Sequence, residues 1–206
     1  MTLENDWQLT RLSNHFREHV EVMARLESCC GSSILSVVET LSTALRSGHK
    51  LLLCGNGGSA AQCQHWAAEF TGRLTQTFVR SALAAIALTT DTSYITAFCN
   101  DVGFDDLFAR QVEALGLHGD VLIGISTSGA SRNVMRAVVR AGELGLQTVV
   151  LTGESGPLQH TADQAIAIPH TDTQIVQEAH VAVYHVICDL VERQLFGQQE
   201  PQAQAD

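Results

Sequence analysis

The chain has 206 residues, the size of one globular domain with an additional segment rather than of two full domains. Hydrophobic residues make up 45% and charged residues 17% of the sequence, which excludes a disordered or fibrous protein. The formal net charge is −10 and Lys50 is the only lysine, so we expect no nucleic-acid partner.

The N-terminal residues Met1–Asp6 contain neither a basic segment nor an apolar one, as a secretory signal would require. No apolar run approaches the roughly 20 residues that span a bilayer, so we expect no membrane partner. The 6 cysteines form no CxxC pair, which favours reduced thiols. Together these features predict a cytoplasmic protein.

Two helices are predicted before any strand. Residues 4–29 carry apolar side chains at helical spacing, Gly31 interrupts that pattern, and Ser32–Ser33 can cap a second helix that ends near Ser47. Neither helix has a sheet of its own. We therefore predict that residues 1–48 form a helical oligomerisation segment, which packs across the main domain or against a second subunit.

Short apolar runs alternate with amphipathic segments from Lys50 onward. The predicted strands are 51–54, 83–87, 121–125, 148–151 and 165–168, and the predicted helices are 59–72, 91–99, 104–115, 131–144 and 173–196. Unbroken apolar strands separated by helices indicate an α/β domain, a three-layer sandwich with a five-stranded parallel sheet, over residues 49–197. Ligands of such domains bind at the carboxyl ends of the strands, where strand order reverses. The glutamine-rich residues 198–206 are predicted to be a disordered tail.

Two of the predicted strands end in loops that suit a phosphate group. The first strand is followed by a glycine-rich loop, and the third by a loop rich in hydroxyls. Glycines let the backbone approach a ligand, hydroxyls donate hydrogen bonds, and a helix N-terminus favours an anion. Arginine is scarce nearby, which favours a small phosphate over a nucleotide. The loops comprise Asn56, Gly57, Gly58 and Ser59, and Ser126, Thr127, Ser128 and Ser131.

A candidate metal site lies on the helix after the glycine-rich loop. His65 and Glu69 are four residues apart, so both project from one face, and imidazole with carboxylate suits a divalent metal such as zinc. On the last helix, spacing alone pairs Gln177 with His180, which lies one turn away. His185 lies about 12 Å from Gln177 along the helix axis.

Several of these motifs together resemble the SIS (sugar isomerase) domain, and in detail the sedoheptulose 7-phosphate isomerases, also called phosphoheptose isomerases. The resemblance runs from about Leu51 to Phe196 and includes both loops, residues 69–73, residues 99–104, Gln177–His180 and His185. It implies a flavodoxin-like sheet, a homotetramer assembled through the N-terminal helices, and one zinc ion per subunit. The implied reaction converts sedoheptulose 7-phosphate to D-glycero-D-manno-heptose 7-phosphate, in the biosynthesis of nucleotide-activated heptose for lipopolysaccharide.

The resemblance also implies roles for individual residues. It matches His65, Glu69, Gln177 and His185 to metal ligands. The spacing argument pairs Gln177 with His180 instead, and we follow the resemblance and choose His185. His180 is then expected beside the site or at an interface. Glu69 is the candidate base and His185 the candidate acid. The implied substrate contacts are Asn56, Gly57, Gly58, Ser59, Glu69, Asn100, Asp101, Ser126, Thr127, Ser128, Ser131 and Gln177.

Two other functions compete with the enzyme. Some SIS proteins bind the bacterial replication initiator without known catalysis, but those lose the acid and histidine pattern that His65, Glu69 and His185 keep here. A sugar-phosphate-sensing regulator would need a DNA-binding segment, and none is visible. Bound zinc would distinguish the enzyme from the non-catalytic protein.

Overall fold

The computed structural model describes residues 6–197, and its core is a parallel sheet. The strands are β1 (Leu51–Gly55), β2 (Ala85–Ala87), β3 (Val121–Ser126), β4 (Gln147–Thr152) and β5 (Gln164–Ala167). Their order is β2-β1-β3-β4-β5, the flavodoxin-like order, which confirms the predicted sheet. Because the order reverses between β1 and β3, the loops that follow these two strands lie side by side at the expected ligand position.

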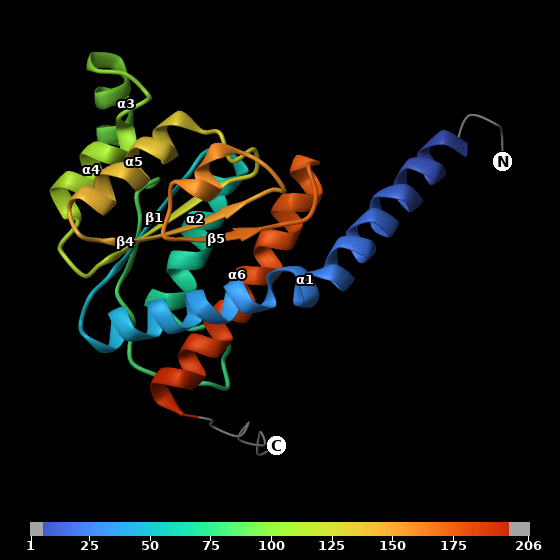
Figure 1. The fold of residues 1–206 in the computed structure, drawn as a ribbon, viewed down its shortest axis with the longest axis horizontal. Helices are drawn as coiled ribbons and strands as arrows, with labels where there is room; N and C mark the ends of the chain where they lie inside the picture. The colour runs from blue at the N-terminus through green and yellow to red at the C-terminus, as the bar shows by residue number, and fades with distance from the viewer. Residues whose placement is uncertain (1–5, 198–206) are drawn as a thin grey trace.

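Helices cover both faces of the sheet (Figure 1). On one face α2 (Gly58–Thr71), α6 (Thr173–Phe196) and α1 (Asp6–Arg46) share a core with alternate strand residues such as Leu53 and Ile123. On the other face α4 (Leu107–Leu115) and α5 (Arg132–Glu143) bury the intervening residues, among them Leu52 and Leu122. The helix α3 (Thr92–Asp101) and a short 3-10 helix, η2 (Pro157–His160), complete the chain. The three-layer prediction is therefore confirmed.

The N-terminal segment differs from the prediction, because α1 is one continuous helix of 41 residues rather than two helices broken at Gly31. A glycine inside a helix costs only about 1 kcal/mol, and the buried side chains on both sides of it, such as Cys30 and Ile34, offset that cost. The second half of α1 packs on α6 and β5, while the first half projects from the molecule (Figure 1). By length and composition alone α1 is long and apolar enough to cross a membrane, a criterion that mostly buried core helices and N-terminal signal sequences also meet.

Three further predictions concern the second strand, the C-terminal tail and the cysteines. The strand predicted over 83–87 is shorter, because Leu83 donates its backbone N–H to Phe70 at the end of α2 instead of joining the sheet. The tail predicted over 198–206 lies outside the described residues. All 6 cysteines are free, as predicted.

Candidate active site

The glycine-rich loop connects β1 to α2, and its first glycine lies close to the backbone of β3. A Cβ at Gly55 would lie 3.0 Å from the Ile125 carbonyl oxygen and from Ser59 Cβ, so any larger residue would force these neighbours to shift. Gly57 has a φ of +56°, which also favours glycine. The loop is held by Asn56, whose side-chain amide exchanges two hydrogen bonds, of 2.8 and 2.9 Å, with the buried amide of Asn133 on α5.

The hydroxyl-rich loop after β3 gathers three serine side chains. Ser126 Oγ lies 2.9 Å from Ser131 Oγ and 3.5 Å from Ser128 Oγ. Gly129 turns the chain with a φ of +61°, and the carbonyl of Thr127 accepts a hydrogen bond from the Gly153 N–H that anchors the loop to the end of β4. Converging hydroxyls at the N-terminus of α5 are suited to hydrogen-bond an anion.

A cavity of about 180 Å³ opens beside the glycine-rich loop. Asn56 and Gly57 line it together with Thr89 and with Phe104, whose aromatic ring is half exposed. The predicted pair Asn100 and Asp101 lies at the end of α3, exposed to solvent, with the Asn100 amide donating to the Asp101 carboxylate at 2.8 Å. Sequence reasoning assigned no role to Phe104, although it lies in the stretch 99–104, and it missed Asn133, because its partner meets it only in the fold.

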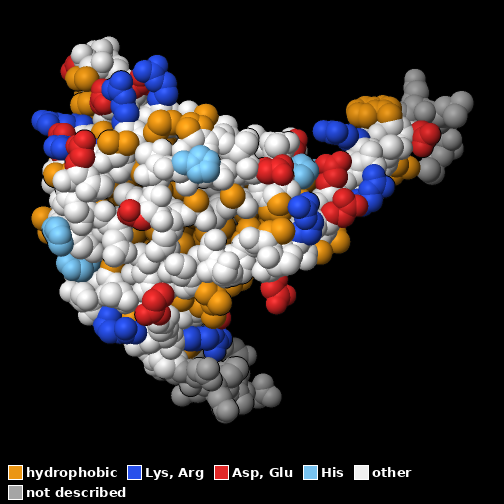
Figure 2. Space-filling model, in the orientation of Figure 1, with side chains coloured by type: hydrophobic (Ala, Val, Ile, Leu, Met, Phe, Trp, Pro, Cys, Tyr) orange, Lys and Arg blue, Asp and Glu red, His pale blue; other side chains and the backbone are white. Residues whose placement is uncertain are grey.

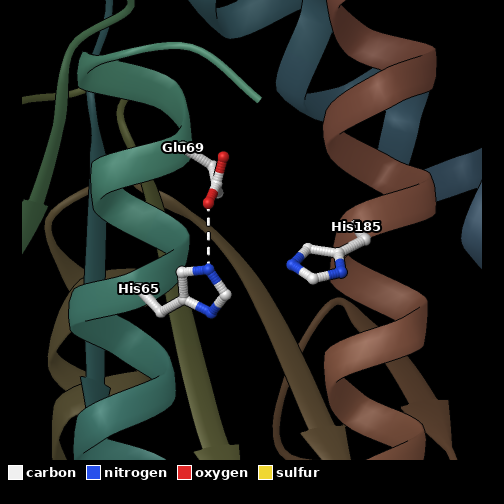
Figure 3. A group of neighbouring side chains, drawn as sticks. All are labelled: His65, Glu69 and His185. Atoms are coloured by element: carbon white, nitrogen blue, oxygen red, sulfur yellow. Dashed lines mark ion pairs between the residues drawn. The ribbon is translucent and has the colours of Figure 1, made fainter. Parts of the chain in front are cut away.

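Three predicted metal ligands converge between α2 and α6. One ligand atom from each of His65, Glu69 and His185 lies within 4.8 Å of the other two, and the three side chains point toward one another (Figure 3). His65 Nε2 lies 2.9 Å from Glu69 Oε1. Burial and the neighbouring His65 lower the pKa of His185, which favours the neutral imidazole that a metal requires. Two imidazoles and a carboxylate are a donor set that fits a zinc ion.

The buried ring of Tyr184 lies behind this cluster. Its hydroxyl is 2.6 Å from His65 Nδ1, and its ring stacks on Trp66 with centroids 5.3 Å apart. Burial is the main cause that raises the pKa of Tyr184 to about 12, so its hydroxyl stays protonated at neutral pH. No sequence pattern singled out Tyr184, because it precedes a predicted ligand and reads as an ordinary core aromatic.

The side chain of Gln177 lies near the start of α2. A Cβ added to Gly58 would come within 2.6 Å of the Gln177 side-chain amide, so the absence of a side chain at Gly58 makes room for it. The backbone carbonyl of Gln177 accepts a hydrogen bond of 2.7 Å from Gln62. Gln177 thus faces the glycine-rich loop, and its role as a fourth metal ligand stays a prediction.

His180 occupies a different environment from His185 on the same helix. It is fully buried, and its Nε2 lies 3.1 Å from the carbonyl oxygen of Thr152 at the end of β4. Burial lowers the pKa of His180 to about 4, so the ring is neutral at physiological pH. The group of converging side chains contains His185 and not His180, and the assignment of His185 as a metal ligand stays a prediction.

Two histidines on the first half of α1 share one carboxylate on α6. His15 Nε2 and His19 Nδ1 contact the two carboxylate oxygens of Glu178, at 2.9 and 2.7 Å. These contacts tie the first half of α1 to the start of α6. Their four-residue spacing was visible in the sequence, but their partner comes from a segment more than 150 residues away.

Comparison with known proteins finds the same family by sequence and by structure. The SIS domain family matches residues 14–153. The phosphoheptose isomerase of Geotalea daltonii is 46% identical over 92% of this chain and 98% of its own length, and that of Geobacter sulfurreducens is 49% identical over 85% and 93%. Among solved structures, the phosphoheptose isomerase of Neisseria gonorrhoeae superposes with a TM-score of 0.84 at 41% identity, covering 90% of this chain and 98% of that one. The enzyme of Francisella tularensis gives 0.86 at 32% identity, covering 94% and 100%.

Proposed function

The chain belongs to the phosphoheptose isomerase family of SIS-domain proteins, and from that premise we propose that it isomerises sedoheptulose 7-phosphate to D-glycero-D-manno-heptose 7-phosphate. The observation that carries this proposal is the convergence of His65, Glu69 and His185 beside two loops suited to phosphate. The product would serve the biosynthesis of nucleotide-activated heptose in the cytoplasm. The competing non-catalytic function has no support among the relatives described above.

The phosphate would bind between the two strand-end loops. Ser59, Ser126, Thr127, Ser128 and Ser131 would donate their hydroxyl hydrogens to its oxygens. The N-termini of α2 and α5 both favour negative charge at this position. Asn56, Gly57, Gly58 and Gln177 would contact the sugar near the glycine-rich loop. Asn100 and Asp101 would contact hydroxyl groups from the end of α3.

One zinc ion per subunit would bind to His65, Glu69, Gln177 and His185. When bound, zinc polarises the substrate's carbonyl group and stabilises negative charge on its oxygen. The support for this site is the close grouping of the His65, Glu69 and His185 ligand atoms on facing helices.

The isomerisation moves a proton between C1 and C2 through an enediol. Glu69 would remove the proton from one carbon, because a carboxylate accepts a proton and its side chain is largely shielded from solvent. Glu69 would give that proton to C2, while His185 would donate a proton to the C2 carbonyl oxygen and take one from the C1 hydroxyl group as the new carbonyl forms at C1. A residue that holds a metal cannot exchange protons at the same atom, so each must release the metal during turnover or use a second atom.

Assembly would involve the projecting half of α1. Large apolar side chains there are more than half exposed, namely Trp7, Leu9, Leu12, Phe16 and Val20. On the face drawn in Figure 2, this projection carries apolar, basic and acidic side chains next to one another. We expect a homotetramer assembled through α1. Light scattering that shows a monomer at micromolar concentration would contradict this.

The direct test is to incubate the purified protein with sedoheptulose 7-phosphate and follow the sugar by NMR. The expected result is an aldose 7-phosphate that forms in proportion to enzyme concentration. The matched substrate control is sedoheptulose without its phosphate, which should turn over far more slowly because the two loops no longer hold it. Absence of the aldose at high enzyme concentration would contradict the proposal.

A further inference from the structure

His65 is the most exposed member of the metal group, so something other than burial must hold its ring in place. The exposed fraction of its side chain is 47%, against 16% for Glu69. An exposed imidazole on a helix is free to change rotamer unless its second nitrogen is bound. That nitrogen, Nδ1, contacts the Tyr184 hydroxyl at 2.6 Å.

Tyr184 is itself immobile. Its side chain is fully buried, it stacks on the equally buried Trp66 at an interplanar angle of 18°, and its ring meets those of His65 and His185 nearly at right angles. The hydroxyl therefore occupies a fixed point behind the cluster. Any His65 rotamer that keeps this hydrogen bond keeps Nε2 on the side of Glu69.

We propose that Tyr184 is a positioning residue for His65: its hydroxyl binds Nδ1 and thereby presents Nε2 to the metal. This inference rests on the proposed metal site and adds a residue to it. Metal-binding histidines commonly use their second ring nitrogen in such a hydrogen bond, which fixes the tautomer and the ring orientation.

A hydroxyl suits this role because it can both donate and accept a hydrogen bond. Without metal, His65 carries its proton on Nε2 and donates it to Glu69, and the Tyr184 O–H donates to Nδ1. With metal on Nε2, the His65 proton lies on Nδ1 and is donated to the tyrosine oxygen. His65 Nε2 could thus exchange Glu69 for the metal while Nδ1 keeps its hydrogen bond to Tyr184.

The test compares Tyr184→Phe with wild type in the full-length protein stripped of metal. The variant removes only the hydroxyl and keeps the stacked ring. The matched control is Tyr94→Phe, the chain's other tyrosine, whose hydroxyl donates to the Leu107 carbonyl at 3.0 Å on the opposite face of the sheet. Zinc affinity is measured by competition with a chromophoric chelator. Thermal unfolding of the metal-free proteins checks that all are folded.

Wild type and Tyr94→Phe should bind one zinc per subunit with equal affinity. Tyr184→Phe should keep that stoichiometry and lose about 10- to 100-fold in affinity, the usual effect of removing such a hydrogen-bond partner. With cobalt(II) in place of zinc, the visible absorption band should shift in Tyr184→Phe alone. Wild type that binds no zinc would overturn the metal site and this inference with it, whereas unchanged affinity in Tyr184→Phe would overturn the inference alone.

A double-mutant cycle separates positioning from a general structural effect. In a His65→Ala background the hydroxyl has no Nδ1 to hold, so adding Tyr184→Phe should change zinc affinity by less than about twofold. An equal loss in both backgrounds would show that Tyr184 acts through the packing of α6 and would overturn the proposal.

Discussion

The strand-end loops and the helix-borne metal group are built in different ways. The loops around Ser59 and Ser128 are shaped by glycine geometry and converging hydroxyls, and hydrogen bonds to neighbouring elements hold them, among them the bonds between Asn56 and Asn133. The group of His65, Glu69 and His185 depends on the packing of two helices that are distant in sequence. We infer that the loops supply binding and the helices supply chemistry, so substitutions in the two regions should affect different kinetic constants.

The largest expected effect is that of His185→Ala. Turnover should fall by at least about 10²-fold, because the proposed proton donor is lost, and zinc content should fall because a proposed ligand is lost. Steady-state kinetics and metal analysis of the purified protein measure both.

The matched control is His180→Ala on the same helix. It should keep its zinc and most of its turnover, and lose about 1–3 kcal/mol of stability, because a buried ring and its hydrogen bond to Thr152 are removed. An inactive, metal-free His180→Ala beside an active His185→Ala would reverse the assignment.

His180 should also make stability depend on pH. Its pKa is about 4 in the folded protein and near 6.5 in the unfolded chain, so the unfolded state binds the proton first as pH falls. The stabilisation is complete above pH 6.5 and declines by about 3 kcal/mol as pH falls to 4. Urea unfolding across this range should show a steeper loss in wild type than in His180→Gln. Parallel curves would show that the buried ring does not titrate in this way.

Ser128→Ala tests the loop side of the comparison. Its hydroxyl is exposed, accepts a 3.3 Å hydrogen bond from the Ala130 N–H and lies 3.5 Å from Ser126 Oγ, so the fold should lose no more than about 1 kcal/mol. A hydrogen bond to a charged phosphate is worth more, so KM should rise about tenfold while kcat changes little. A variant that unfolds readily but binds substrate normally when folded would show that the loop is structural.

Gly58→Ala should have the smallest effect of these variants. It tests the contact between the glycine-rich loop and Gln177 on α6. The added methyl group would collide with the Gln177 amide, which can move because it ends a flexible side chain. Stability should therefore change by less than about 1 kcal/mol, since alanine is the better helix former. Zinc affinity should fall severalfold if Gln177 is a ligand. The control is Gly142→Ala, where an added Cβ meets nothing within 4 Å. Equal zinc affinity in both variants would remove Gln177 from the metal site.

The sequence predicted the sheet and its helices well, because short apolar runs such as 121–125 that alternate with helical patterns are typical of buried strands. It failed at Gly31, where the local helix-breaking signal was weaker than the tertiary burial of Ile34 and its neighbours. In the site, the four-residue spacing predicted that His65 and Glu69 share one face of a helix, and their side chains do lie 2.9 Å apart. The sequence could not identify Tyr184 or Asn133, because their partners belong to other elements.

The measurement that tests the central claim most directly is deuterium exchange into sedoheptulose 7-phosphate in D₂O by wild type and Glu69→Gln. The variant keeps the size of the side chain but cannot accept a proton. Wild type should exchange the substrate's C1 hydrogen with solvent, and Glu69→Gln should do so at least about 10²-fold more slowly. Its affinity for the substrate should stay within severalfold of wild type, because the two loops are intact. Exchange by Glu69→Gln at the wild-type rate would contradict the account.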